Sequence, residues 1–183
     1  TKSNPGKDRG ILRVVPLGGL GEVGKNMMIM EYIADGVHDS VLIDTGIMFP
    51  ENDMLGVDYI IPDFNYIMDR LDTIRGVIIT HGHEDHTGAI AHVMKHVDAP
   101  IYATRLTRGL LEVKLQDAGL LDQIELVTVQ AGESADMGVF KTEFFHQTHS
   151  IPDCVGVGLT TPVGLVVHTG DYKFDHSPVD GWP

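Results

Sequence analysis

The densest group of chemically active side chains lies in the segment THGHEDHTGA, residues 80–89. Three histidines and two acids occupy the six positions from His81 to His86. Neutral imidazole and carboxylate groups are common ligands of zinc and similar divalent metals. Each residue alone has a plainer explanation, since a single histidine is usually solvated and Asp85 could cap a helix. The set as a whole favours a metal site.

An expected strand, the apolar run GVIIT at residues 76–80, leads directly into this segment. Sites in layered α/β folds usually lie where such a buried strand ends. His81 and His83 project to the same side of an extended loop, because side-chain direction alternates along it. Asp85 and His86 fall at the start of an expected helix and can turn back toward the same point. Four ligands this close together suit two metals better than one.

Two further polar residues follow strands in the same way. His149 comes just after the expected strand 139–146, and Asp171 comes just after the expected strand 164–170. Both lie far along the chain from His81, so the fold must bring these segments together.

A glycine pattern near the N-terminus, Gly19, Gly21 and Gly24, has the G-x-G-x-x-G spacing of a dinucleotide-binding turn. That turn requires a helix next, whose N-terminus binds a pyrophosphate. The sequence that follows, KNMMIMEY, has no N-cap residue and no polar helical stripe. The acidic residue about twenty positions on, Asp44, ends a strand two elements later. We therefore expect a strand-to-strand turn near the site.

The elements that must position these residues are mostly short strands with a few helices between them, which predicts an α/β fold of sheets covered by helices. A loop with two prolines spans 47–64, and loops of that length are usually functional. The expected strands are 11–17, 26–32, 40–46, 76–80, 100–104, 124–129, 139–146, 155–161 and 164–170. The expected helices are 65–71, 86–97 and 106–119.

The composition is ordinary for a soluble protein of 183 residues, 43% of them apolar, and predicts one domain. No run of about 18 apolar residues occurs, and the opening TKSNPGKDRG has no signal-peptide core. We therefore expect a cytoplasmic protein that does not bind membranes. The single cysteine, Cys154, cannot form an internal disulfide or a Cys-x-x-Cys metal knuckle. Any metal must use histidine and carboxylate.

The formal net charge is −13, from 13 basic and 26 acidic residues. Passive electrostatic binding of nucleic acid needs a basic face, which this composition does not favour. Bound divalent cations or another domain can supply the positive field, so a nucleic-acid enzyme is not excluded.

The H-x-H-x-D-H signature at 81–86 resembles the metallo-β-lactamase fold superfamily. Within it, four longer phrases are similar to the N-terminal portion of the ribonuclease J family, a β-CASP family. They are PLGGLGEVGKNM, DTGIMFPENDMLGVDYIIPDF, THGHEDHTGAI and GDYKFDHSPVDG. The signature alone indicates only the superfamily, whose chemistries are many.

The resemblance implies a site for two zinc ions. One zinc would be held by His81, His83 and His149. The other would be held by Asp85 and His86, with Asp171 bridging the two.

The same resemblance implies further roles for acidic residues. Asp85 and Asp171 would be catalytic, with Asp85 also able to accept a proton. Asp44 would lie behind the ligands and orient them, as outer carboxylates commonly do. A histidine that the family supplies to the second zinc from far downstream has no match here.

The implied fold is the first half of an αββα four-layer sandwich. Residues 1–183 would form a partial metallo-β-lactamase-like domain, and the β-CASP and C-terminal domains would be absent. We therefore expect a fragment that is inactive alone.

The implied function is that of a zinc-dependent ribonuclease, with 5′–3′ exonuclease and endonuclease activity in RNA maturation and decay, including rRNA processing. It would hydrolyse RNA phosphodiesters by a two-metal hydroxide mechanism. RNA is the implied substrate, and the full-length protein would be a homo-oligomer with partners in RNA-degradation complexes.

Three alternatives remain open at this point. A thioester or lactone hydrolase would use the same half-site, although the loop at 47–64 speaks against it. Flavo-diiron oxidoreductases carry glutamate where this chain has His83, and histidine favours zinc. A non-catalytic fragment that binds RNA or a partner is the third. His92 and His96 share a helix face, and we expect them to be a solvated surface pair.

Overall fold

A computed structural model of the chain describes residues 10–178 and residue 181. Residues 1–9, for which we expected no signal peptide, lie outside the described residues. The same applies to residues 179–180 of the phrase GDYKFDHSPVDG.

The larger of two sheets has six strands in the order in which they occur along the chain. Its first three strands are antiparallel, and the remaining pairs are parallel. The strands are β1 (Ile11–Gly18), β2 (Met27–Ala34), β3 (Val37–Ile43), β4 (Ile74–Ile79), β5 (Ile101–Ala103) and β6 (Leu126–Thr128). The ends of each strand lie within about three residues of the ends expected from the sequence.

The smaller sheet is antiparallel throughout, in the order β10-β9-β8-β7. Its strands are β7 (Ser134–Met137), β8 (Phe140–His146), β9 (Val155–Thr161) and β10 (Gly164–His168). The sequence did not predict β7, because this edge strand is only four residues long and buries only Met137, so its alternation of polar and apolar residues is too short to recognise. Its pairing with β8 defines it instead.

The helices are α1 (Asn65–Met68), α2 (Glu84–Thr87), α3 (Ile90–Met94) and α4 (Arg105–Asp117). The single helix expected over 86–97 is wrong, because the chain breaks between α2 and α3. There the N–H of Ala89 donates to the carbonyl of Thr45 (2.8 Å), a contact outside the helix. The helix expected over 65–71 also ends early, at Met68, and a separate 3-10 turn follows at Leu71–Thr73.

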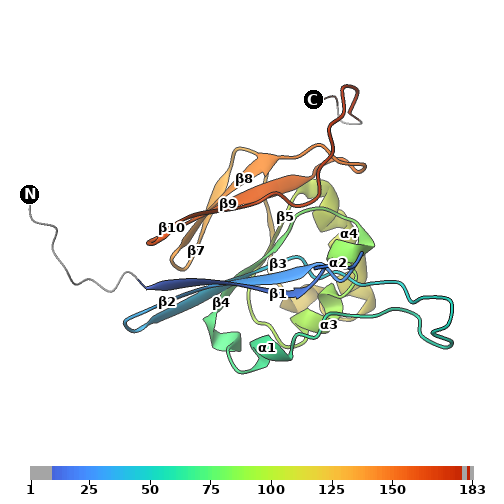
Figure 1. Cartoon of the computed structure of the whole chain (residues 1–183), viewed down its shortest axis with the longest axis horizontal. Helices are drawn as coiled ribbons and strands as arrows, with labels where there is room; N and C mark the ends of the chain where they lie inside the picture. The colour runs from blue at the N-terminus through green and yellow to red at the C-terminus, as the bar shows by residue number, and fades with distance from the viewer. Residues whose placement is uncertain (1–9, 179–180, 182–183) are drawn as a thin grey trace, which may run out of the picture.

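Figure 1 shows three layers, with the small sheet over one face of the large sheet and the helices over the other. A separate apolar core fills each interface. The core under the helices includes Ile29, Leu42, Val77, Ile79, Ile90, Val93, Leu111 and Leu115. The core between the sheets includes Met30, Val41, Ile43, Ile78, Phe140, Phe144, Val157 and Leu159.

Strand β4 shows how these cores position the residues that follow it. Val77 and Ile79 face the helices, while Ile78 faces the small sheet, and all three are fully buried. A strand buried on both faces reads as a continuous apolar run. Its C-terminal end therefore emerges between the helices and the small sheet, where Thr80 and His81 are both fully buried.

The outer face of the small sheet carries exposed apolar side chains, including Leu165 (62% exposed) and Val167 (56%). Within the described residues no helix lies over this face, so they form three of the four expected layers (Figure 1). In the same residues, no helix has both the length and the apolar character needed to cross a membrane.

Candidate metal centre

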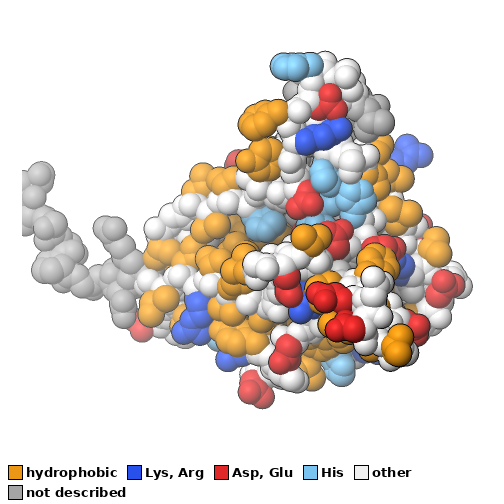
Figure 2. All heavy atoms as spheres, turned by 45° about the vertical axis from the view of Figure 1, so that its right-hand side comes forward, with side chains coloured by type: hydrophobic (Ala, Val, Ile, Leu, Met, Phe, Trp, Pro, Cys, Tyr) orange, Lys and Arg blue, Asp and Glu red, His pale blue; other side chains and the backbone are white. Residues whose placement is uncertain are grey.

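Histidine and aspartate side chains from four segments meet at the carboxyl end of β4. They are His81 and His83 after β4, Asp85 and His86 in α2, His149 after β8, and Asp171 after β10. Figure 2 shows histidine side chains gathered beside acidic ones on the face that it presents. The structure thus brings together every residue that the sequence predicted for the metal site.

The first group joins three imidazoles from both sheets. The Nδ1 atom of His83 lies 3.1 Å from Nε2 of His81 and 3.2 Å from Nε2 of His149. Ligands arranged tetrahedrally around zinc, with Zn–N bonds of about 2.0–2.1 Å, lie roughly 3.3 Å apart. The three nitrogens therefore have the chemistry and the spacing of three ligands of one metal ion.

The second group surrounds His86, which is buried. Its Nε2 atom lies 3.5 Å from Oδ2 of Asp171 and 3.6 Å from Oδ2 of Asp85. The same Asp171 oxygen is 3.7 Å from Nε2 of His149 in the first group. Ligand atoms of His81, His86 and Asp171 all lie within 4.8 Å of one another. Asp171 therefore stands between the two groups, where a bridging ligand would lie.

Asp44 orients the second group from behind. Its buried carboxylate accepts a hydrogen bond from Nδ1 of His86 through Oδ2 (2.8 Å). This contact places a proton on Nδ1 and points Nε2 toward Asp85 and Asp171.

The same carboxylate reaches the first group through Thr80. The Thr80 hydroxyl donates to Oδ2 of Asp44 (2.9 Å) and lies 3.0 Å from Nδ1 of His81. Because the hydroxyl proton goes to Asp44, the Thr80 oxygen accepts the Nδ1 proton of His81. The Nε2 lone pair of His81 is then directed toward His83. The sequence indicates a role for Asp44 but not for Thr80, which it predicts only as the last residue of a strand.

The backbone of Asp44 has φ of 61°, in the left-handed region. Such a conformation costs of order 1–3 kcal/mol for a residue other than glycine, and it persists where the surroundings hold it. Here the N–H of Thr80 donates to Oδ1 of Asp44 (2.8 Å) and the N–H of Asp44 to the carbonyl of Ile78 (2.8 Å). These contacts tie the end of β3 to the end of β4.

The cluster has strongly perturbed pKa values. Burial, reinforced by the neighbouring His86, lowers the pKa of His81 to about 3, so its lone pair is free at neutral pH. Burial also opposes protonation of His86, but the Asp44 carboxylate and the Asp171 hydrogen bond raise its pKa to about 10. The hydrogen bond with His86 lowers the pKa of Asp171 to about 2. The anions around His86 thus favour a positive charge at this position, which a divalent cation supplies.

Asn26 is a further contact of the second group that the sequence analysis missed. Its side-chain Nδ2 lies 3.3 Å from Oδ2 of Asp85 and 3.1 Å from Nε2 of His86. The only sequence signal was its position directly after the glycine turn. That turn joins the antiparallel strands β1 and β2, which excludes a dinucleotide-binding helix, and it borders a cavity of about 150 Å³ that His86 and Asp171 also line.

Two other histidines are accounted for without metal. The His92 ring nitrogen Nε2 lies 2.9 Å from the Tyr59 hydroxyl, and His96 packs its ring against Phe64. Neither belongs to a group of possible metal ligands among the described residues. The interpretation as a surface pair is therefore favoured, with the correction that His92 is half-buried.

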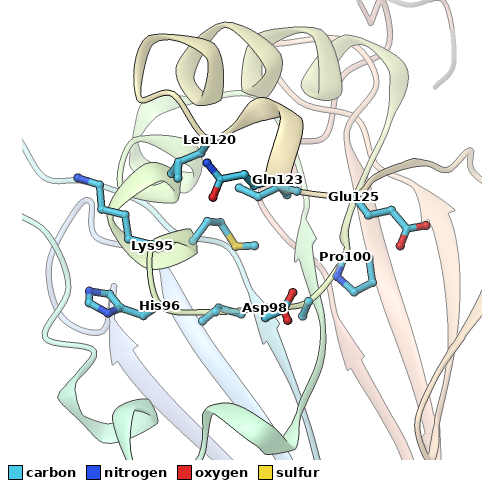
Figure 3. A pocket seen from close by; sticks show the side chains of 11 residues that line it. Lys95, His96, Asp98, Pro100, Leu120, Gln123 and Glu125 are labelled. Carbon is cyan, nitrogen blue, oxygen red and sulfur yellow. The ribbon is translucent and has the colours of Figure 1, made fainter.

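A larger hollow of about 350 Å³ lies near Pro100, at the opposite end of the parallel strands from His81 (Figure 3). Side chains of both charges, including Lys95 and Asp98, line it. It contains none of the ligand groups described above.

Comparison with known sequences identifies related proteins. Residues 21–183 match the family described as the Metallo-beta-lactamase superfamily. Ribonuclease J of Synechocystis sp. is 44% identical over 172 residues, which are 93% of this chain and 26% of that protein. Ribonuclease J 1 of Streptococcus pyogenes is 43% identical over 166 residues, which are 91% of this chain and 29% of that protein. The chain therefore spans well under a third of the length of these relatives.

Solved structures agree with this assignment at the level of the fold. A protein of unknown function from Enterococcus faecalis has a TM-score of 0.66 at 18% identity, covering 91% of this chain and 45% of that chain. The metallo-beta-lactamase fold protein YhfI from Bacillus subtilis has a TM-score of 0.59 at 18% identity, covering 91% and 64%. The fold class expected from the sequence is confirmed.

Proposed function

The chain belongs to the metallo-beta-lactamase superfamily, and from this membership we propose that it forms the metal-binding part of a zinc-dependent ribonuclease that hydrolyses RNA phosphodiesters. The observation that carries the proposal is the convergence of imidazole nitrogens from His81, His83 and His149 at 3.1 and 3.2 Å. They lie in a chain that is 44% and 43% identical to two proteins named ribonuclease J.

Two cations would be bound by the two groups. His81, His83 and His149 would hold the first, and His86 with Asp85 the second, while Asp171 would contact both. A ligand set of histidine and aspartate without cysteine suits zinc. When bound, the pair of cations would polarise the phosphodiester and bring the pKa of a water molecule toward neutrality.

The residues of the chain would serve this chemistry in three ways. Asp44 and Thr80 would hold the protons of His86 and His81 on Nδ1, so that both Nε2 atoms would face the cations. Asp85, whose side chain is 33% exposed, is open enough to accept the proton of the attacking water. Burial of His81 and His86 excludes bulk water from one side of the site.

Binding of RNA by this chain would depend on the cations, because its net charge of −13 gives no general attraction for a polyanion. The scissile phosphate would therefore be held mainly at the metal centre. We extend the proposal to 5′–3′ exonuclease and endonuclease action in cytoplasmic RNA maturation and decay, by a homo-oligomer that has partners in RNA-degradation complexes.

Metal analysis of the isolated chain is the first test. Metal is first removed with a chelator, and the chain is then reloaded with zinc and dialysed. It should retain about one zinc, because His81, His83 and His149 supply three protein ligands, as in many zinc sites. His149→Ala should abolish this binding, and His92→Ala should leave it unchanged. A folded chain that retains no zinc would refute the metal site.

Catalysis requires a second test, in a chimera where this chain replaces the matching 26% of the Synechocystis ribonuclease J. The chimera should cleave 5′-monophosphorylated RNA in zinc-dependent fashion. Replacing Asp85 or His86 by Ala should abolish cleavage and leave RNA binding largely intact. Retained cleavage in these variants would exclude the two-metal mechanism.

A further inference from the structure

Asn26 connects the glycine turn to the second ligand group. Its side-chain Nδ2 lies 3.1 Å from the carbonyl oxygen of Asp85, 3.3 Å from its Oδ2 and 3.1 Å from Nε2 of His86. One amide group thus contacts both residues proposed to hold the second cation. The proposed function assigns no role to it.

The backbone around Asn26 is held independently of its side chain. The N–H of Asn26 donates to the carbonyl of Asp85 (3.1 Å), and the N–H of Gly46 donates to the carbonyl of Asn26 (2.9 Å). These bonds join the segment before β2 to α2 and to the segment after β3. The fold therefore does not need the amide to keep the segments together.

We propose that Asn26 is a positioning residue that orients the carboxylate of Asp85 for the second divalent cation. The inference rests on the proposed function and adds a residue to it. A carboxylate on a half-exposed side chain has several rotamers, and a fixed hydrogen bond reduces that freedom before the metal arrives. Outer groups that orient metal ligands typically contribute 10–100-fold to metal affinity.

The neutrality of the amide suits this task. Lysine or arginine would also donate to Asp85, but either would neutralise the carboxylate and repel a nearby cation. An amide donates without adding charge. Asparagine therefore holds Asp85 in place and leaves its full negative charge for the metal.

The glycine turn has the shape needed to admit this side chain. Gly19 has φ of 86°, and a Cβ at this position would lie 2.5 Å from Oδ1 of Asn26. Any larger residue would displace the amide. Strand β2, not a dinucleotide-binding helix, follows the G-x-G-x-x-G pattern in this fold. At Gly19, glycine is required because the Asn26 side chain occupies the space that a Cβ would need.

The test is a zinc titration of the metal-free chain, with Asn26→Ala and the similarly sized Asn26→Leu as variants. The unchanged chain should show a tight and a weak binding step. Both variants should keep the tight step within about twofold and weaken the second step at least tenfold, within the range expected for an outer group. Asn52→Ala, in the exposed loop, should match the unchanged chain in both steps.

A double-mutant cycle separates positioning from a general structural effect. If Asn26 acts through Asp85, adding Asn26→Ala to Asp85→Ala should weaken the second step no further than Asp85→Ala alone. The role of Asn26 would be overturned if the effects of Asn26→Ala and Asp85→Ala on the second binding step were fully additive. It would also be overturned if Asn26→Ala or Asn26→Leu folded and bound the second zinc as tightly as the unchanged chain. If the unchanged chain binds no zinc at all, the proposed function itself fails, which is a different result.

Discussion

Asp44 sets the orientation of two histidines at once. It accepts the Nδ1 proton of His86 directly and the Thr80 hydroxyl proton, which in turn fixes His81. The pKa of Asp44 stays below its ordinary value because the effects of His86 and the Thr80 N–H outweigh burial. One buried anion therefore controls which ring nitrogens would face a bound metal.

Asp44→Asn tests this control, and asparagine tolerates the positive φ, so the backbone is not strained further. The amide cannot accept from His86 and from both donors of Thr80, which leaves buried donors unpaired. We expect the free energy of unfolding of the metal-free chain to fall by about 1–3 kcal/mol and zinc affinity to fall roughly 10–100-fold. Denaturant unfolding and zinc titration measure the two effects.

The control for Asp44→Asn is Asp53→Asn, at an exposed loop position. It should change neither quantity. Wild-type stability and affinity in Asp44→Asn would show that the carboxylate does not orient the histidines.

At the scale of elements, the segment after β3 must pack closely against α2. The N–H of Thr45 donates to the carbonyl of His86 (2.8 Å), and that of Ile47 to the carbonyl of Glu84 (3.1 Å). Between them, Gly46 approaches α2 so closely that a Cβ would overlap the carbonyl oxygen of Asp85. Because residue 46 is a glycine, α2 can lie directly against the end of the sheet. Asp85 and His86 of α2 then lie beside the residues that follow β4.

Gly46→Ala should therefore displace α2. The overlap involves backbone atoms, which cannot move aside as a flexible side chain would, so we expect at least about 1–3 kcal/mol of destabilisation. The second zinc step should be lost with it. Chemical unfolding and zinc titration provide the measurements.

Gly109→Ala is the matched substitution in an element away from the site. Gly109 lies in α4, and a Cβ there would meet open space. Alanine should stabilise this helix by roughly 0.5–1 kcal/mol. If both substitutions had the same small effect, close packing at Gly46 would not matter.

At the scale of the whole molecule, the first ligand group joins the two sheets. His81 and His83 follow β4 of the large sheet, whereas His149 follows β8 of the small sheet. A metal bound by all three would hold the sheets together and would bind the unfolded chain only weakly. Metal binding should therefore stabilise the whole fold.

Zinc should accordingly raise the free energy of unfolding, by about 2.7 kcal/mol when free zinc is a hundred times its dissociation constant. A chelator should reverse the effect in denaturant unfolding. In His149→Ala the stabilisation should disappear, because the small sheet no longer contributes a ligand. Equal stability of the unchanged chain with and without zinc would contradict the prediction that a bound metal holds the two sheets together.

Without metal, the apolar core between the two sheets holds them together. Phe140 is fully buried in the core between them. Phe140→Ala should lower the free energy of unfolding by about 3–5 kcal/mol. Phe174→Ala, at a side chain 97% exposed, should change it by less than about 0.5 kcal/mol. Similar losses in both variants would argue against this core.

The sequence by itself determined the local features of the site. A buried strand ending at the segment 80–86, two histidines at i and i+2, and a glycine turn without a following helix are all visible in short stretches of chain. Such features depend on side-chain alternation and on which residues can begin a helix, and both are properties of neighbouring residues. The positions of His149 and Asp171 after two later strands indicated them as partners, and the resemblance to a known family added the role of Asp44 and the metal that each residue would hold.

Only the tertiary structure decided how these parts meet. The distance from His83 to His149 depends on how two sheets pack, which is the sum of many apolar contacts with no local pattern. The break between α2 and α3 and the contacts of Thr80 and Asn26 have the same origin. Each arises because a polar or backbone group finds its partner in a segment distant along the chain, and buried polar groups must have such partners.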